Sequence, residues 1–340
     1  MNLEKELKLE QALAGLPRIQ LGVKPTPLEP MKRLSQTLGG PPIYIKRDDL
    51  TGLAFGGNKT RMLEFSLAEA LNREAEVIVT GAAVQSNYCR QMAAACAKLG
   101  LELHLVMRPV RPIDKQDVQG NQLLQRLFGA KVTILEDDNR AKQQEAIAAE
   151  AKRLAAAGKK VYVPRQDDTV DLDVIAYAES ALEIVRQCRE LDIQPGLLYV
   201  AAFDTTQAGL VLGLKYLDSP IRVKGFSPLE NEPDRRQKMA KMANQAANRL
   251  DLAIEFDEAD FDNDDSFVGE RYGIPTEAGL EAIRTVARTE GILLDPVYTS
   301  KAMSALIAHI QTHLISAETP VIFVHTGGAP ALFGYAQEIL

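Results

Sequence analysis

The residues of this chain best suited to chemistry stand in a glycine-containing turn. After a strand-like apolar run at 43–46, a polar segment leads to Gly56, Gly57, Asn58 and Lys59, where a helical pattern begins. Glycine tolerates positive φ and lets the backbone approach a ligand closely. A lysine in the first turn of a helix lies at the positive end of the helix dipole, which favours its neutral amine. Such an amine can form a Schiff base; the alternative is a surface lysine that follows a glycine loop.

A second candidate site is the tripeptide Gln85-Ser86-Asn87. It lies between a strand pattern at 77–81 and a helical pattern at 86–99. The free N–H groups and the dipole of a helix N-terminus favour an anion, such as a substrate carboxylate. Ser86 is also a good N-cap residue, and the capping and binding roles are compatible.

Strand and helix patterns alternate along the chain and must position these residues. The strand patterns lie at 43–46, 77–81, 101–107, 131–135, 160–163, 197–201, 221–226 and 321–325. Helical patterns lie at 62–72, 86–99, 115–128 and 139–157. This order predicts an α/β fold with two doubly wound domains, each a mostly parallel sheet flanked by helices. The acidic run at 257–265 is interpreted as a solvated loop.

Composition and charge exclude several classes of protein. The 340 residues include 39 Lys plus Arg and 46 Asp plus Glu, giving a net charge of −7, which argues against nucleic-acid binding. With 46% apolar residues the chain is not disordered. The sequence has neither an apolar run long enough for a bilayer nor a secretory signal, so we expect no membrane partner. Three cysteines without a CxxC pair favour the cytoplasm and predict no metal site.

Several segments together resemble one family. They are similar to the aminocyclopropane-carboxylate deaminases and D-cysteine desulfhydrases, pyridoxal-phosphate enzymes of the tryptophan-synthase-β-like fold (fold type II). The similarity runs in family order from about residue 17 to the C-terminus. The matching segments are Pro25-Thr26-Pro27-Leu28, KRDDLTGLAFGGNKTR at 46–61, Gln85-Ser86-Asn87, Tyr272-Gly273-Ile274-Pro275, Asp295-Pro296-Val297-Tyr298-Thr299 and His325-Thr326-Gly327-Gly328. No GxGxxG or GxSxG motif supports a nicotinamide-binding protein or a serine hydrolase.

The resemblance implies roles for individual residues. Lys59 is implied to bind pyridoxal 5'-phosphate through its amine, beside Asn58, and then to move the α-proton. Asn87 is implied to contact the ring hydroxyl of the cofactor. Gln85, Ser86 and Asn87 are implied to bind the substrate, and Ser86 also to take part in catalysis.

Further roles are implied for later segments. Tyr272 and Tyr298 match the active-site tyrosine pair of the family; they could also be aromatic residues at the rim of the core. The start of the helix after strand 197–201 is implied to bind the phosphate. The cofactor-binding residues implied in these later segments are Thr205, Thr206, Gln207, Thr326 and Gly327.

Two threonines favour one branch of the family. Thr299 stands where the cyclopropane deaminases have a glutamate facing the pyridine nitrogen, and Thr326 is the desulfhydrase-like residue near that nitrogen. A hydroxyl does not keep a proton on the ring, so the ring is a weaker electron sink. That suits β-elimination, in which the leaving group takes the electron pair. The resemblance therefore favours a desulfhydrase-like lyase that gives a 2-oxo acid and ammonia.

The chain departs from the family around the expected phosphate. Met62 replaces a common lysine, Tyr88 replaces a histidine, and Asp167-Asp168-Thr169 replaces a Gly-Gly-Ser turn. The segment 202–210 reads AFDTTQAGL, so Asp204 replaces glycine in the phosphate loop. A carboxylate beside a phosphate costs on the order of 1–4 kcal/mol at a partly exposed site. The aspartates could alter or abolish phosphate binding, recognise a cationic substrate group, or simply face solvent.

Three hypotheses of function remain open. The first is a β-eliminating lyase or deaminase acting on a small amino acid, with D-cysteine as the first substrate to test. The second is a cysteate sulfo-lyase or an aminocyclopropane-carboxylate deaminase. The third is a degenerate family member that binds ligands without this chemistry. The family pattern also implies a homodimer, a larger domain of residues 1–61 and 171–340, and an inserted smaller domain of residues 62–170, with the cofactor in the cleft between them.

Overall fold

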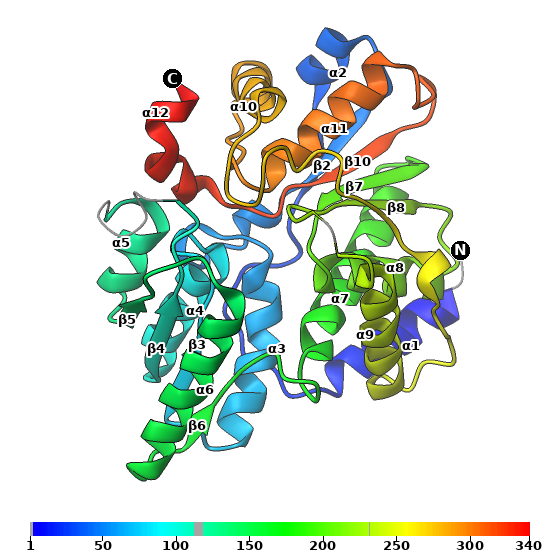
Figure 1. Ribbon diagram of the computed structural model, residues 1–340. Helices are drawn as coiled ribbons and strands as arrows, with labels where there is room; N and C mark the ends of the chain where they lie inside the picture. Colours follow the sequence, from blue (N-terminus) through cyan, green and yellow to red (C-terminus); the bar gives the residue numbers. More distant parts are fainter. Residues whose placement is uncertain (1–2, 112–117, 231) are drawn as a thin grey trace.

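The strands of the chain form two separate sheets. The computed structural model describes residues 3–111, 118–230 and 232–340. Within this part, a six-stranded sheet has the order β1-β2-β10-β7-β8-β9, and a four-stranded sheet has the order β5-β4-β3-β6 (Figure 1). The strands are β1 (Leu28–Pro30), β2 (Ile43–Lys46), β3 (Val77–Thr80), β4 (Glu102–Met107), β5 (Lys131–Ile134), β6 (Val161–Tyr162), β7 (Leu197–Ala201), β8 (Arg222–Phe226), β9 (Asp262–Asp264) and β10 (Val321–Val324). Every pairing is parallel except that of β1 with β2.

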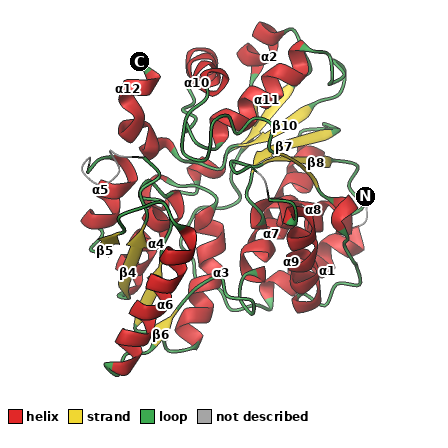
Figure 2. Ribbon diagram, viewed as in Figure 1, coloured by secondary structure: helices red, strands yellow, loops and turns green. Residues whose placement is uncertain are grey.

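Helices cover both faces of both sheets (Figure 2). They are α1 (Leu3–Ala14), α2 (Lys32–Leu38), α3 (Lys59–Asn72), α4 (Asn87–Leu99), α5 (Gly120–Leu127), α6 (Arg140–Ala156), α7 (Asp171–Glu190), α8 (Thr205–Tyr216), α9 (Arg235–Arg249), α10 (Glu277–Glu290), α11 (Thr299–Gln311) and α12 (Ala336–Ile339). On the larger sheet, α1, α7, α8 and α9 pack on one face and α2, α10 and α11 on the other. On the smaller sheet, α3 and α4 lie opposite α6. None of the described helices is long and apolar enough to cross a membrane.

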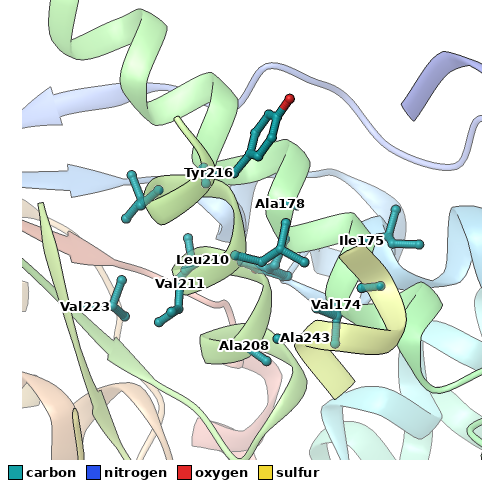
Figure 3. Close-up of a cluster of buried hydrophobic side chains, with 14 of the residues drawn as sticks. Val174, Ile175, Ala178, Ala208, Leu210, Val211, Tyr216, Val223 and Ala243 are labelled. Atoms are coloured by element: carbon teal, nitrogen blue, oxygen red, sulfur yellow. The ribbon is translucent and has the colours of Figure 1, made fainter. Parts of the chain in front are cut away.

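The core of the larger sheet fixes the position of α8. Its side chains include Val174 and Ala178 of α7 and Leu210 of α8 (Figure 3). The two helices approach closely at Gly209, where an added Cβ would lie 2.2 Å from the carbonyl oxygen of Val174 and 2.4 Å from Tyr177 Cβ. This contact holds the N-terminus of α8 at the carboxyl end of β7.

A buried ionic network surrounds the start of α3. The Asp48 carboxylate and the Arg61 guanidinium are fully buried and lie 3.0 Å apart. Asp48 also accepts a hydrogen bond of 2.6 Å from the Tyr177 hydroxyl, and Arg61 contacts Glu183 at 2.7 Å. The charged side chains of Asp48 and Arg61 therefore connect the start of α3 to α7.

The architecture agrees with the sequence-based expectation in its main features. The α/β class with two parallel-sheet cores is confirmed, and each predicted strand has a counterpart. The interpretation of 257–265 as loop alone is wrong, since Asp262–Asp264 forms edge strand β9 beside β8. It and β1 were missed because a three-residue edge strand pairs through its backbone and carries too few side chains to show a pattern. The predicted helix 115–128 lies partly outside the described residues, and its described part is α5.

Candidate active site

One cavity brings most of the predicted site residues together. It has a volume of about 280 Å³ and lies between the carboxyl ends of β3 and β7, the edge at which parallel sheets bind ligands. The predicted residues that line it are Asn58, Lys59, Ser86, Asn87, Thr205, Thr206, Tyr272, Tyr298 and Thr326. Larger hollows among the described residues, of about 680, 660, 520 and 420 Å³, contain none of the predicted site residues.

Lys59 is the first residue of α3 and follows a turn that requires glycine. Gly57 has φ 126°, and a Cβ there would lie 2.7 Å from Gln91 Nε2 and 3.0 Å from the carbonyl oxygen of Thr326. Burial lowers the pKa of the Lys59 amine to about 7, and the Arg165 guanidinium adds to this effect. Near neutral pH a large share of this amine is therefore uncharged, which makes it a competent nucleophile and base.

The orientation of the Asn87 amide follows from its partners. Asn87 Oδ1 accepts hydrogen bonds from Arg90 Nη1 at 2.9 Å and from Asn121 Nδ2 at 2.8 Å. Arg90 is itself buried and donates to the carbonyl oxygen of Gly56 at 2.7 Å. With two donors at its oxygen, Asn87 has only its Nδ2 group left for a ligand, and that group can only donate. The amide is suited to an anionic oxygen.

The side chains of Gln85 and Ser86 have different roles. Ser86 lines the cavity and is the N-cap of α4, because its Oγ accepts a hydrogen bond from the Cys89 N–H at 3.2 Å. Gln85 does not line the cavity. Its amide donates to the carbonyl oxygen of Gln119 at 3.1 Å and accepts from the Asn121 N–H at 2.9 Å. The Gln85 side chain thus anchors the start of α5.

Tyr272 and Tyr298 form a pair in the wall of the cavity. Their hydroxyl oxygens are 2.5 Å apart, and the Phe203 ring contacts both rings. Burial raises the pKa of both hydroxyls. The loop that carries Tyr298 is held by the buried Asp295 carboxylate, which accepts from the N–H groups of Tyr298 at 2.9 Å and Thr299 at 2.8 Å. The Thr299 hydroxyl donates to the same carboxylate at 2.7 Å and does not line the cavity.

The N-terminus of α8 also borders the cavity. Its first N–H groups have no acceptor within the helix. Thr206 Oγ1 accepts a hydrogen bond of 3.1 Å from Asn58 Nδ2, which joins this terminus to the turn before α3. The Gln207 side chain points elsewhere, since it donates to the carbonyl oxygen of Asp262 and accepts from Asn263 Nδ2, each at 2.7 Å. Only the backbone of Gln207 is available to a ligand here.

The segment after β10 supports the glycine turn. Thr326 lines the cavity, and its carbonyl oxygen accepts a hydrogen bond of 3.0 Å from the Asn58 N–H. Gly327 has φ 91° and packs against Gly57, where an added Cβ would lie 2.6 Å from the Gly57 Cα. Gly327 therefore shapes the turn and does not line the cavity itself.

The acidic departures from the family separate into two groups. Asp167 and Asp168 are exposed, and Asp168 accepts a hydrogen bond of 2.9 Å from Arg73. Neither of these two aspartates lines the cavity, whereas Asp204 does. Met62 is fully buried and does not line the cavity either. Of the three aspartates, only Asp204 faces the site.

Sequence reasoning missed two arginines of the cavity. Arg108 follows β4, and its guanidinium lies 5.9 Å from the centre of the Tyr272 ring. Arg165 follows β6 and stacks on Tyr88, with 3.9 Å between the guanidinium and the ring centre. Their positions in the sequence could have identified them, because both arginines stand just after strands whose carboxyl ends meet at the ligand-binding edge.

A family model, two named relatives and a solved structure each match this chain over most of its length. Residues 19–327 match the family model described as pyridoxal-phosphate dependent enzyme. A D-cysteine desulfhydrase of Serratia proteamaculans (strain 568) is 40% identical over 339 residues, covering 98% of this chain and 100% of the relative. A D-cysteine desulfhydrase of Salmonella typhi is 39% identical over 331 residues, covering 96% and 98%. A crystal structure of an ACC deaminase homologue has a TM-score of 0.88 at 32% identity and covers 98% of each chain.

Proposed function

Because the chain belongs to the family of pyridoxal-phosphate dependent enzymes, we propose that it is a β-eliminating lyase acting on a small amino acid. Its products are a 2-oxo acid and ammonia. D-cysteine is the proposed substrate, since the relatives at 39% and 40% identity carry the name D-cysteine desulfhydrase. With D-cysteine and water, the balanced products are pyruvate, ammonia and hydrogen sulfide.

The residues around the cavity fit the cofactor. Its volume of about 280 Å³ is close to the lower end of the roughly 300–1,000 Å³ typical of small-ligand sites. The amine of Lys59 is available to a carbonyl carbon, the amide of Asn87 can donate to the ring oxygen, and the N-terminus of α8 with Thr205 and Thr206 can bind the phosphate. These groups supply one partner for each polar part of the cofactor.

We assign catalysis to four residues that line the cavity. Bound pyridoxal phosphate supplies a carbonyl that captures an amine and a ring that withdraws electrons from the α-carbon. Lys59, whose pKa burial lowers to about 7, accepts the α-proton. Ser86 and the N-terminus of α4 bind the substrate carboxylate. Tyr272 and Tyr298 keep their protons because burial raises the pKa of both hydroxyls, so the pair can protonate the departing sulfur.

The surroundings of the expected pyridine nitrogen favour elimination over cyclopropane ring opening. Thr326 lines the cavity, whereas the Thr299 hydroxyl is bound to Asp295. Among the described residues lining the cavity, the single carboxylate is that of Asp204, the residue immediately before α8. A pyridine nitrogen whose partner is a hydroxyl would stay unprotonated, and the neutral ring would be a weaker electron sink. The reaction would then depend on a good leaving group such as a thiolate. We therefore rank the desulfhydrase reaction above aminocyclopropane-carboxylate deamination.

We also propose the organisation of the protein. All four strands of the smaller sheet lie between residues 62 and 170, which supports an inserted domain of that extent within a larger domain of residues 1–61 and 171–340. The three cysteines are free and buried, in keeping with a reducing cytoplasm. A homodimer is proposed from the family resemblance.

The position of the Lys59 amine in one cavity with Asn87, Ser86 and the tyrosine pair is the observation that carries this proposal, and a visible spectrum tests it. The purified protein is expected to be yellow, to bleach with borohydride and to release sulfide and pyruvate from D-cysteine. Lys59→Ala is expected to lose both the colour and the turnover. A protein that stays colourless with added pyridoxal phosphate would instead support the degenerate, non-catalytic alternative. Release of sulfite from cysteate, without sulfide from D-cysteine, would favour the sulfo-lyase.

A further inference from the structure

The start of α8 combines an anion-binding helix terminus with a carboxylate of the chain itself. Asp204 is the residue immediately before α8 and lines the cavity. Its Oδ1 atom is buried and accepts no hydrogen bond within the described structure. Burial raises the pKa of the Asp204 carboxyl, and the Arg235 and Arg165 guanidiniums offset this only in part. A phosphate bound here would lie close to the Asp204 carboxyl, and a nearby cation would offset the repulsion between the two negative groups.

Arg165 is held in place from three sides. Its Nε donates to the buried Asp173 carboxylate at 2.7 Å, its guanidinium stacks on the Tyr88 ring at 3.9 Å, and its Nη2 lies 3.7 Å from Met62 Sδ. Its backbone has φ 62°, a left-handed conformation that is uncommon for a residue other than glycine. Guanidinium has five N–H donors, and Asp173 uses only one of them. The Nη1 group has no acceptor in the described structure and remains available to the cavity.

Arg165 lies near both the Lys59 amine and the start of α8. It lines the cavity with both, and its charge lowers the pKa of both Lys59 and Asp204. The described cations lining the cavity are Lys59, Arg108 and Arg165. Lys59 is committed to the carbonyl of the cofactor, and the Arg108 guanidinium lies 5.9 Å from the centre of the Tyr272 ring. Of these three lining cations, Arg165 is the one whose charge acts on Asp204, the residue before α8.

We propose that Arg165 binds the cofactor phosphate together with the N-terminus of α8, and that it offsets the charge of Asp204. This inference rests on the proposed function. A planar guanidinium suits a phosphate because it can donate two parallel hydrogen bonds. The Asp173 carboxylate and the Tyr88 ring are positioning groups, since they orient the guanidinium without lying at the helix terminus.

Equilibrium dialysis of the full-length chain, stripped of cofactor, tests the proposal with two ligands. Pyridoxal 5'-phosphate and pyridoxal differ only in the phosphate group. Arg165→Gln is expected to weaken binding of the phosphorylated ligand about tenfold or more, with pyridoxal affinity changed by less than about twofold. Arg165→Lys should recover part of the loss. Arg153→Gln, at an exposed arginine of α6, is the matched control and should change neither affinity.

Two further variants make the result independent of folding and of local charge. Arg165→Gln with Asp173→Asn removes the pair together, so no buried carboxylate is stranded, and the same selective loss is expected. Asp204→Asn should strengthen binding of the phosphorylated ligand and leave pyridoxal unaffected. The role of Arg165 would be overturned if the double variant lost affinity equally for both ligands. It would also be overturned if neither Arg165→Gln nor the double variant lost affinity for pyridoxal 5'-phosphate. A wild-type chain that binds neither ligand would overturn the proposed function as well.

Discussion

Replacing Asp48 by Asn is expected to lower the free energy of unfolding by about 3 kcal/mol at pH 7. The Asp48 carboxylate accepts hydrogen bonds from Arg61, from the Thr26 hydroxyl at 2.7 Å and from the Tyr177 hydroxyl at 2.6 Å. An Asn side chain has an NH2 group in place of one carboxylate oxygen, so at least one of these three N–H or O–H donors would face another donor. Breaking a buried ion pair costs about 3–5 kcal/mol, and the lower end applies because Arg61 keeps Glu183 as a partner at 2.7 Å.

The pH dependence of this effect has a definite sign. Burial acts to raise the pKa of Asp48, but the charges of Arg61 and Lys46 outweigh it, so the pKa lies below its ordinary value. A carboxyl whose pKa is lowered by folding stabilises the fold above its unfolded pKa of about 3.9 and loses that contribution as the pH falls. The difference between wild type and Asp48→Asn should therefore be complete at pH 7 and shrink below about pH 4.

Urea unfolding followed by circular dichroism measures this difference. Asp168→Asn is the matched control, because that side chain is 62% exposed and pairs with an exposed Arg73; its effect should stay within about 0.5 kcal/mol. If Asp48→Asn proved as mild as Asp168→Asn, the ionic network would not join α3 to α7 as argued. An undiminished difference between wild type and Asp48→Asn at pH 3 would refute the pH argument.

The remaining predictions concern the site and the core. In the cofactor-free chain, reductive methylation of Lys59 should rise through about pH 7, as mass spectrometry would detect, because protonation below that pH blocks the amine; labelling only near pH 10 would contradict its lowered pKa. Tyr298→Phe should lower kcat by about 100-fold or more with the yellow colour retained, since it removes the hydroxyl 2.5 Å from Tyr272; unchanged kcat would remove the tyrosine from the mechanism. Gly209→Ala should cost about 1–3 kcal/mol in urea unfolding because its Cβ would lie 2.2 Å from a carbonyl oxygen of α7, whereas Gly15→Ala meets only ordinary contacts and should be nearly neutral.

Local sequence determined the parts of the site that lie within one turn or one helix start. The glycine turn before Lys59 and the N-cap at Ser86 are short-range features, because they depend on backbone conformation and on neighbouring N–H groups. Strand patterns likewise predicted the two parallel-sheet cores, since continuous apolar runs identify strands buried on both faces. The positions of Gln85 and Gln207 were beyond such reasoning, as both side chains bond to distant backbone groups and turn away from the cavity.

Only the tertiary structure decided which charges face the cavity. Asp168 and Asp204 have the same side chain and both follow strands, yet the first pairs with Arg73 at the surface and the second lines the cavity. Arg165 lies more than 100 residues from Lys59 along the chain but close enough in space to lower the pKa of its amine. The local sequence decides whether a residue can carry a charge. The tertiary structure decides which groups surround that charge, because electrostatic interactions depend on distance and burial and not on separation along the chain.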